Sequence, residues 1–310
     1  MLNILIPGAG GPAAIGCIKA LRMSKERCKI ISVDPNPLSA GFFLSDKFYT
    51  IPYAKNEKAL IKSMIKICKT EKIHILMPTS GFDTPIHAKN REKFEKLGIC
   101  LPFSDFPVIR ICQDKWRLYC SIKNKDIMPF TTDNIKEITL PFIMKPKIGK
   151  GSQKVFICKT REDIPFALNR VEDPIFQKLL IGKEYTVDVL SDLKGKSLVA
   201  VPRERIEIKA GITSKGKITL DKEIQQVCLD VAKELNIKGP SCMQLKKDEQ
   251  GKPKLIDVNT RLGGATVMTT LAGINFPELL IKLCKKEKFI VPRPREITIT
   301  RYWEELVVEN

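Results

Sequence analysis

The sequence has few of the residues that build zinc sites or nucleophilic active sites. It contains only two histidines, His74 and His87, and its ten cysteines include no Cys-x-x-Cys pair. Structural zinc sites need such closely spaced ligands, so zinc chemistry is not expected. No cysteine–histidine or serine–histidine set suggests covalent catalysis either.

Long apolar stretches are also missing. The sequence has no run of about 18 apolar residues, and Leu2–Ile6 leads directly into a glycine turn where a signal peptide would continue. We therefore expect a cytoplasmic protein with no membrane partner. In that reducing compartment the scattered cysteines should stay reduced, as small apolar side chains of the core.

Acidic residues are outnumbered, because 53 Lys and Arg against 35 Asp and Glu give a formal charge of +18. Such an excess suggests nucleic-acid binding. However, lysines 62, 66, 69 and 72 recur at helical spacing, which is typical of a solvated helix face, and no aromatic–basic motif accompanies the charge. We expect no nucleic-acid partner, although a positive field favours anionic ligands such as nucleotides.

The first hundred residues alternate between strand-like and helix-like patterns. The patterns predict strands over 2–6, 29–33 and 73–77, and helices over 12–23, 57–69 and 84–97. This alternation predicts a mainly parallel sheet with helices on both faces.

A glycine-rich turn joins the first predicted strand to the first predicted helix. Gly8, Gly10, Gly11 and Gly16, with Asp34 ending the second strand, occupy the positions of a dinucleotide-binding fingerprint. The spacing is loose, and the same glycines serve simply to turn the chain and pack a helix on a sheet. A dinucleotide site and a purely structural turn both remain open.

A second glycine-rich loop follows a strand that carries lysines. The strand over 140–147 includes Lys145, the loop has the sequence Ile-Gly-Lys-Gly-Ser-Gln over 148–153, and another strand follows over 154–158. The N–H groups of such a loop can wrap a polyphosphate, with Lys145 as a positive charge at its base. It is no Walker P-loop, because a strand rather than a helix follows.

A hairpin near the C-terminus gathers oxygen ligands. Gln244 precedes its turn, and the returning strand carries Asp257, Asn259 and Arg261 at alternate positions. These three side chains should therefore share one face, with Gln244 roughly opposite Asp257. Carboxylate and amide oxygens suit Mg²⁺, and an arginine can hold a phosphate oxygen.

The same alternation predicts that Ile256 and Val258 point into the core. Around this hairpin, a further strand is predicted over 197–205 and a helix over 221–235. The last third of the chain should thus form an antiparallel α+β lobe.

Four motifs in this order resemble the ATP-grasp superfamily. They are Gln113-Asp114-Lys115, Lys145-Pro-x-x-Gly-x-Gly-Ser, Gln177-x-x-x-x-Gly-Lys-Glu-Tyr-Thr-Val-Asp and Asp257-x-Asn-x-Arg-x-Gly-Gly. They are most similar to the branch of the carbamoyl-phosphate synthase large chain, which includes small carboxylate–amine ligases such as the pyrrolysine-pathway ligase. The resemblance spans nearly the whole chain.

The resemblance implies an α/β fold, in which a Rossmann-like parallel-sheet domain precedes a two-lobed α+β ATP-grasp module. The expected divisions are 1–104 for the first domain, 105–178 for a central lobe with a glycine-rich lid, and 179–310 for a C-terminal lobe with the metal and phosphate site. ATP and Mg²⁺ are the implied cofactors, with Mn²⁺ as an alternative metal. Similar enzymes are commonly homodimers.

The resemblance also implies roles for individual positions. Those that would bind ATP are Lys115, Lys145, Gly149, Gly151, Ser152, Gln177, Lys178, Leu180, Glu184 and Arg205. Those that would bind the metal are Gln244, Asp257 and Asn259. The implied catalytic residues are Arg261, Lys145 and Asp257.

Further contacts are implied around the substrates. Gly263 and Gly264 would expose N–H groups near the substrate carboxylate, and Arg203 lies, like Arg205, where similar ligases supply phosphate or substrate contacts. Three features depart from the pattern of relatives. Asp257 stands where most carry glutamate, Lys178 stands where glutamate is frequent, and Gln153-Lys154 replaces a common Arg-Gly after the lid.

The implied function is an ATP- and Mg²⁺-dependent ligase that activates a small carboxylate, such as an amino acid, as an acyl phosphate and joins it to an amine. A nicotinamide-dependent oxidoreductase that uses Asp34 is one alternative, although it leaves Asp257 and Arg261 unexplained. A non-catalytic nucleotide-binding protein is another. His87 is expected near the edge of the N-terminal sheet, where it could line a substrate crevice.

Overall fold

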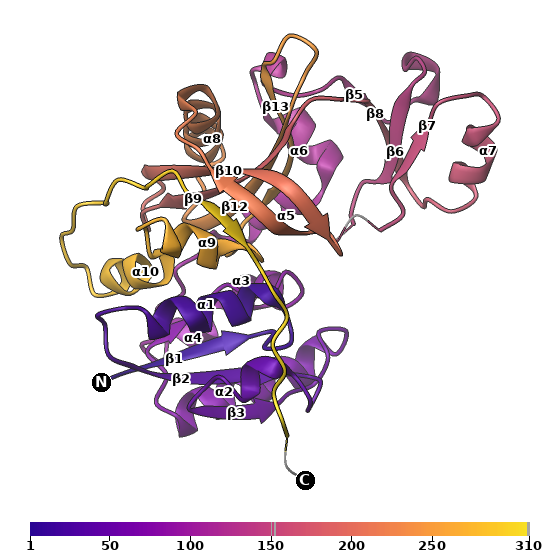
Figure 1. Cartoon of the computed structure of the whole chain (residues 1–310). Coiled ribbons are helices and arrows are strands. Elements are labelled where there is room, and N and C mark those ends of the chain that lie inside the picture. Colours follow the sequence, from indigo (N-terminus) through magenta and orange to yellow (C-terminus); the bar gives the residue numbers. More distant parts are fainter. Residues whose placement is uncertain (150, 152, 309–310) are drawn as a thin grey trace.

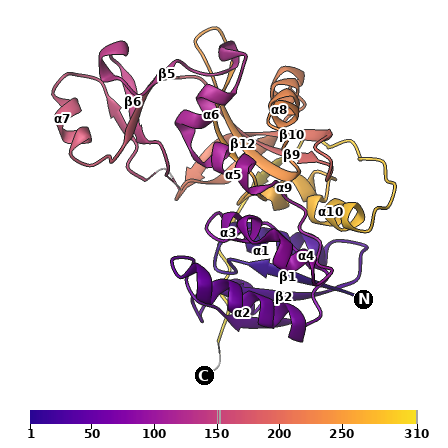
Figure 2. The ribbon, with the colours of Figure 1, turned by 180° about the vertical axis from the view of Figure 1, so that it is seen from behind.

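The computed structural model describes residues 1–149, 151 and 153–308 (Figure 1). Three sheets organise it: a four-stranded sheet in an N-terminal domain, a four-stranded sheet in a central lobe and a six-stranded sheet in a C-terminal lobe. Figures 1 and 2 show the central lobe projecting to one side, away from the N-terminal domain. Among the described residues, no helix combines the length and apolar character needed to cross a membrane.

The N-terminal domain is built on a parallel sheet with the strand order β3-β2-β1-β4. Its elements are β1 (Leu2–Pro7), α1 (Pro12–Arg22), β2 (Cys28–Asp34), η1 (Ala40–Phe42), β3 (Lys47–Thr50), α2 (Glu57–Thr70), β4 (Ile75–Leu76), α3 (Thr84–Lys89) and α4 (Arg91–Glu95). Ile4 and Ile6 pack in the same core as Ile18 of α1, whereas Leu5 packs with Leu60 of α2. The predicted parallel sheet with helices on both faces is confirmed.

Two local features differ from the prediction. β3 was not predicted, because it is a short edge strand with a polar, mostly exposed sequence. The helix predicted over 84–97 is interrupted at Asn90, whose backbone leaves helical geometry and whose Nδ2 donates to the Ile86 carbonyl oxygen at 3.0 Å. A local side-chain hydrogen bond thus competes with continuation of the helix.

The central lobe holds an antiparallel sheet with the order β5-β8-β6-β7. Its elements are η2 (Lys125–Ile127), β5 (Thr131–Thr132), η3 (Ile135–Glu137), β6 (Phe142–Pro146), β7 (Phe156–Cys158), α7 (Asp163–Leu168) and β8 (Pro174–Lys178). Phe142 and Phe176 meet edge-to-face in its small core, so the two predicted strands around the glycine loop are present.

The C-terminal lobe is built on an antiparallel sheet with the order β13-β12-β9-β10-β11-β14. Its elements are β9 (Glu184–Ser191), β10 (Ser197–Lys209), β11 (Ile212–Ile218), α8 (Lys222–Glu234), β12 (Gly239–Lys247), β13 (Pro253–Asn259), α9 (Thr266–Leu271), α10 (Phe276–Cys284) and β14 (Thr298–Thr300). Helices α5 (Phe106–Gln113) and α6 (Lys115–Ser121) pack in its core through Cys112 and Leu118. By packing, α6 and one side of α5 thus belong with this lobe, whereas Phe106 and Ile109 of α5 pack in the N-terminal core. The division at 105 and 178 stays a prediction.

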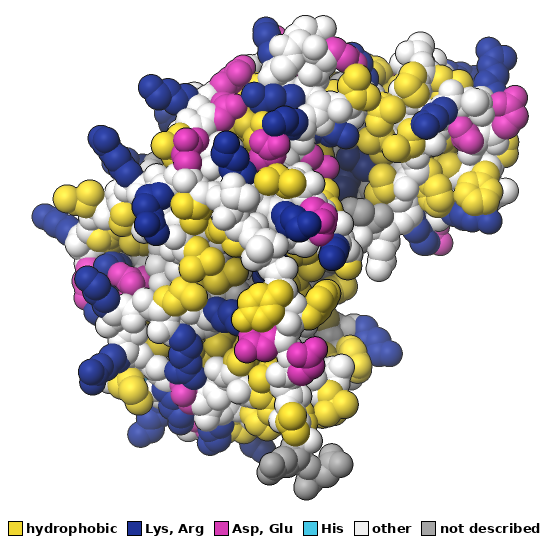
Figure 3. Space-filling model, in the orientation of Figure 1, with side chains coloured by type: hydrophobic (Ala, Val, Ile, Leu, Met, Phe, Trp, Pro, Cys, Tyr) yellow, Lys and Arg dark blue, Asp and Glu magenta, His cyan; other side chains and the backbone are white. Residues whose placement is uncertain are grey.

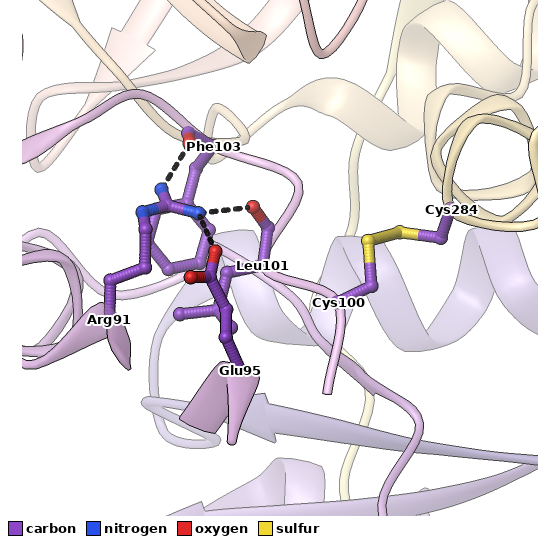
Figure 4. Close-up of a disulfide and its surroundings, with 6 residues drawn as sticks. All are labelled: Arg91, Glu95, Cys100, Leu101, Phe103 and Cys284. Atoms are coloured by element: carbon purple, nitrogen blue, oxygen red, sulfur yellow. Dashed lines mark hydrogen bonds and ion pairs between the residues drawn. A yellow bond between two sulfur atoms is a disulfide. The ribbon is translucent and has the colours of Figure 1, made fainter. Parts of the chain in front are cut away.

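The expectation that every cysteine is reduced was wrong for one pair. Cys100 and Cys284 form a disulfide across a Cα–Cα distance of 5.9 Å, which joins the end of the N-terminal domain to α10 (Figure 4). Arg91 anchors the adjoining segment, because its Nη1 donates to the Leu101 carbonyl oxygen at 3.1 Å and its Nη2 to that of Phe103 at 2.6 Å. The N-terminal domain is therefore fixed against the C-terminal lobe.

Candidate active site

Two lysines lie where the central and C-terminal lobes meet. Lys145 extends from β6, and only 6% of it is exposed. Its Nζ donates to Gln177 Oε1 at 2.8 Å, and Gln177 Nε2 donates to Thr131 Oγ1 at 2.8 Å. Lys115 opens α6, and its Nζ donates to the carbonyl oxygen of Gly149 at 3.3 Å. Figure 3 shows basic side chains in the recess between these two lobes.

The electrostatics of Lys145 show which groups converge there. Burial and, second, the positive charge of Lys115 lower the pKa of Lys145 to about 8, while the carboxylate of Asp257 acts in the opposite direction. Lys145 has a neutral amide as its hydrogen-bond partner, so its buried charge is only partly compensated. A phosphate group would supply the missing negative charge.

The metal-ligand residues predicted on the hairpin lie together. Gln244 is the cross-strand partner of Asp257, as expected, and Asn259 Nδ2 donates to Asp257 Oδ2 at 2.8 Å. All three side chains are half-buried. One carboxylate and two amides therefore meet on one face of β12 and β13.

The predicted orientation of Ile256 was wrong. The register shifts after the Gln244–Asp257 pair, so that the next residue of β12 pairs with Leu255 and Ile256 has no cross-strand partner. Leu255 and Val258 are buried, whereas Ile256 is half-exposed. This β-bulge breaks the simple alternation next to the metal-ligand residues, which is a common device beside functional sites.

The donor set fits Mg²⁺ better than a metal held by protein alone. Among residues 1–149, 151 and 153–308, no group of three or more His, Cys, Asp and Glu is placed to hold a metal. Asp257 supplies the one carboxylate, and Gln244 and Asn259 supply amide oxygens. Mg²⁺ keeps several waters and takes substrate phosphates as ligands, so these residues suit an ion that binds together with a triphosphate.

The segment after β13 connects this hairpin to the N-terminal domain. Arg261 Nη1 donates to the carbonyl oxygen of Leu262 at 2.7 Å, and the Leu262 N–H donates to the carbonyl oxygen of Pro78 at 2.9 Å. Pro78 follows β4 at the carboxyl edge of the parallel sheet. Arg261 is therefore placed between the metal-ligand residues and that edge.

The glycine after Leu262 is dictated by close packing. A Cβ atom on Gly263 would lie 2.9 Å from Cys242 Sγ and 3.0 Å from Asp188 Oδ1. Any other residue at this position would require one of these neighbouring atoms to move. A Cβ atom on Gly264 would lie 3.3 Å from Pro12 Cγ at the start of α1. This turn therefore touches both the C-terminal lobe and the N-terminal domain.

Comparison with known proteins agrees with this geometry. Residues 170–305 match the family described as "ATP-grasp in the biosynthetic pathway with Ter operon", and residues 4–101 match "PylC-like, N-terminal domain". The chain thus contains an ATP-grasp domain within residues 170–305. The carbamoyl phosphate synthase large chain of Clostridium botulinum (strain Loch Maree / Type A3) is 25% identical over 285 residues, which cover 80% of this chain and 25% of that relative.

Solved structures share the fold. The biotin carboxylase domain of Hydrogenobacter thermophilus 2-oxoglutarate carboxylase, described in complex with MgADP and bicarbonate, is 18% identical with a TM-score of 0.74 and covers 94% of this chain and 71% of its own. The L-amino acid ligase from Bacillus licheniformis is 18% identical with a TM-score of 0.70, over 92% and 74%. The mixed α/β architecture is thus that of ATP-grasp proteins.

Two residues that the ATP-grasp resemblance assigns to the nucleotide pair with each other. Arg205 Nη1 donates to Glu184 Oε1 at 2.5 Å, and Arg205 Nη2 donates to the Gly211 carbonyl oxygen at 2.7 Å. The bond from Arg205 engages only one of the two carboxylate oxygens of Glu184. Arg205 can reach a phosphate only by exchanging these partners.

The adenine and lid positions are placed in part. Lys178 donates its backbone N–H to the Phe130 carbonyl oxygen at 2.9 Å, while the Leu180 N–H donates to no described residue. Gly151 has a positive φ of 62°, which favours glycine in the lid. Ser152 lies outside the described residues.

The N-terminal glycine turn is closed by the protein itself. The Gly10 N–H donates to Asp34 Oδ2 at 2.9 Å, and the Gly41 N–H donates to the Ala9 carbonyl oxygen at 3.0 Å. In a dinucleotide site the turn amide and the acid would face pyrophosphate and ribose. The geometry therefore favours the structural role over the dinucleotide alternative.

His87 does not line a crevice as expected. It is 1% exposed, its ring packs edge-on against Phe94, and burial lowers its pKa to about 3, so it is a neutral core residue. Asp188, the last residue of the third motif, was assigned no role from the sequence, yet it is buried on β9 and pairs with Arg203.

Proposed function

We propose that this chain is an ATP- and Mg²⁺-dependent ligase that activates a small carboxylate, such as an amino acid, as an acyl phosphate and joins it to an amine. The observation that carries the proposal is the partly compensated, buried Lys145, which lies within electrostatic reach of both Lys115 and Asp257. Positive charge from one lobe and oxygen donors from the other thus face a common space, as a metal–triphosphate complex requires.

The chemistry needs no nucleophilic side chain. A carboxylate oxygen attacks the γ-phosphorus of ATP, the bond to ADP breaks, and an acyl phosphate forms. The amine then attacks the acyl carbon, phosphate leaves with its oxygen, and the amine loses a proton. Lys115, Lys145 and Arg261 neutralise charge on the transferred phosphoryl group. A Mg²⁺ ion held by Gln244, Asp257 and Asn259 would add to this neutralisation.

The substrate pocket in this proposal lies between the Gly263–Gly264 turn and the carboxyl edge of the N-terminal sheet. The Leu262–Pro78 hydrogen bond and the approach of Gly264 to Pro12 support this placement, because they bring the sheet edge beside Arg261. Ligands of open α/β sheets bind at this edge. The shared fold with an L-amino acid ligase is consistent with amino-acid substrates.

Three further parts of the proposal concern the whole protein. We propose that it is cytoplasmic, that Mn²⁺ can replace Mg²⁺, and that it forms a homodimer, a state that light scattering of the purified protein would test. The biotin carboxylase domain with a similar fold is described as a dimer.

Release of ADP tests the activity directly. The purified protein with ATP and Mg²⁺ is screened against pairs of small carboxylic acids and amines, beginning with amino acids. ADP that appears only when both substrates are present supports a ligase. Nucleotide that stays bound without ADP release for every pair would support a non-catalytic nucleotide-binding protein instead.

A further inference from the structure

One arginine in the C-terminal lobe is fully enclosed yet incompletely paired. Arg203, on β10, has 0% of its surface exposed. Its Nη1 donates to Asp188 Oδ2 at 3.0 Å and to Thr269 Oγ1 at 3.3 Å. Its Nε and Nη2 have no hydrogen-bond partner among the described residues. Buried guanidinium N–H groups without acceptors are costly, so their presence points to an additional anion.

A second arginine lies on the same face of the sheet. In and after β14, Thr298 and Thr300 are exposed whereas Ile299 and Arg301 are half-buried, so Arg301 projects to the same side as Ile299. Ile299 pairs with Gly216, and Gly216 pairs with Arg205 on the strand that also carries Arg203. Gly216 leaves room there, because a Cβ atom on it would lie 3.1 Å from Arg203 Cδ.

The charges of the two arginines are not balanced. Burial and, second, the positive charge of Arg203 lower the pKa of Arg301. No carboxylate within residues 1–149, 151 and 153–308 forms an ion pair with Arg301. Asp188 forms its ion pair with Arg203, so no described carboxylate is left to pair with Arg301.

The arginine pair lies beside the proposed reaction site. Asp188, which binds Arg203, has its Oδ1 3.0 Å from the Cβ position of Gly263. The Arg301 N–H donates to the carbonyl oxygen of Ser214 on β11 at 2.9 Å, and Ile212 Cγ2 of the same strand lies 3.6 Å from the Cβ position of Gly264. Figure 1 shows the chain after β14 running down over the N-terminal domain. Arg203 is enclosed, so it contributes only its positive charge, whereas Arg301 is half-buried and is the side chain that a ligand can reach.

We propose that Arg301, backed by Arg203, binds a carboxylate that does not react, such as the free carboxylate that an amino acid retains when its amine is acylated. The site lies beyond Gly263, and Lys115, Lys145 and Arg261 already serve the phosphates. This inference rests on the proposed ligase function. The non-reacting carboxylate belongs either to the amine substrate or to the acyl donor as a second acid group.

The test has two arms. In the first, each amino acid is compared with its carboxamide as the amine substrate. In the second, an acyl donor with a second, side-chain acid group is compared with the analogue in which that side-chain acid is a carboxamide. In one of the two arms, the acid is expected to exceed the amide in kcat/KM for ADP release by about 10–100-fold, as a charge-assisted contact supplies. Arg301→Ala should remove this preference by weakening only the acid. Arg301→Lys, which keeps the charge, should retain part of it.

The matched control is Arg293→Ala, which removes an exposed arginine of the same segment and should leave both substrates unchanged. Equal use of acid and amide by the wild-type enzyme, or an equal loss of both in Arg301→Ala, would overturn the inference while the ligase function stands. If no pair releases ADP, the proposed function has failed. In that case, saturation-transfer NMR of amino acids with the wild type and with Arg301→Ala tests the anion site independently of the ligase activity. Equal binding of amino acids to both proteins would refute the anion site.

Discussion

The charge of Lys145 is expensive to keep, because its ammonium group is buried and its hydrogen-bond acceptor is the neutral amide of Gln177. Removal from water and the nearby charge of Lys115 both favour the neutral amine. The sequence predicted Lys145 as a phosphate ligand, but it could not show the Gln177–Thr131 support. That support depends on the pairing of β5, β6 and β8, which are distant in sequence.

The lowered pKa of Lys145 predicts how ATP affinity depends on pH. A lysine is charged below its pKa, so the charge that attracts phosphate is lost as the pH rises through about 8. The Kd for ATP should rise above pH 8, approaching about tenfold per pH unit. In Lys145→Arg, which stays charged, the Kd should change much less. Calorimetric titrations from pH 7 to 9.5 measure both, and identical pH profiles would contradict this role.

Asp257 supplies the only carboxylate of the predicted metal set. We expect Asp257→Asn to reduce ADP formation by at least about 10³-fold, since charge neutralisation on the phosphates is the main catalytic contribution. We also expect the wild-type protein to bind Mg²⁺ tightly only with ATP, because two amides and one carboxylate leave most ligand positions to water and phosphate.

The control for Asp257→Asn is Asp230→Asn, the same chemical change on α8, where Asp230 accepts a hydrogen bond from Gln226 within its own helix. It should release ADP like the wild type. Tight Mg²⁺ binding without nucleotide would show that the metal site has been assigned incorrectly.

Among the elements, the hairpin of β12 and β13 shows what sequence can and cannot predict. Its turn and alternating polar residues correctly predicted the Gln244–Asp257 pairing. The bulge at Ile256 was not predicted, because an extra residue in one strand leaves no compositional mark. The break at Asn90 was missed because it depends on a local side-chain hydrogen bond, and β3 was missed because it is a short, mostly exposed edge strand.

The Gly263 turn gives a prediction at the scale of an element. Gly263→Ala would press its methyl group against Cys242 Sγ and Asp188 Oδ1 and displace Arg261 from the transferred phosphoryl group, so kcat/KM should fall by about 10²-fold while the Kd for ATP rises far less. The double variant with Cys242→Ala should recover part of the loss. The control is Gly16→Ala, within α1. Its methyl group would lie 3.7 Å from the backbone N of Val267, an ordinary contact, so the variant should stabilise the protein by about 0.5–1 kcal/mol. No effect of Gly263→Ala would remove the role given to this turn.

At the scale of the whole molecule, the order of lobes followed from motifs and periodicity, but their mutual attachment did not. The apolar patterns show that α5 and α6 each have a buried face, but they do not show which sheet covers that face. In the structure, these two helices pack on the C-terminal lobe. The disulfide links cysteines separated by 184 residues, a distance over which no sequence spacing carries information.

The Cys100–Cys284 disulfide predicts a dependence of stability on reductant. It closes most of the chain into one loop, so reducing it should lower the free energy of unfolding by up to about 5 kcal/mol through the entropy of the unfolded state. Denaturant unfolding of the wild type should therefore shift on addition of dithiothreitol, while Cys100→Ser should unfold at the lower stability in both conditions. Cys120→Ser, which removes an exposed free cysteine, should behave like the wild type. If Cys100→Ser matches the oxidised wild type, packing and hydrogen bonds such as those of Leu262 to Pro78 and Asn275 to Ala20 suffice to hold the two domains together.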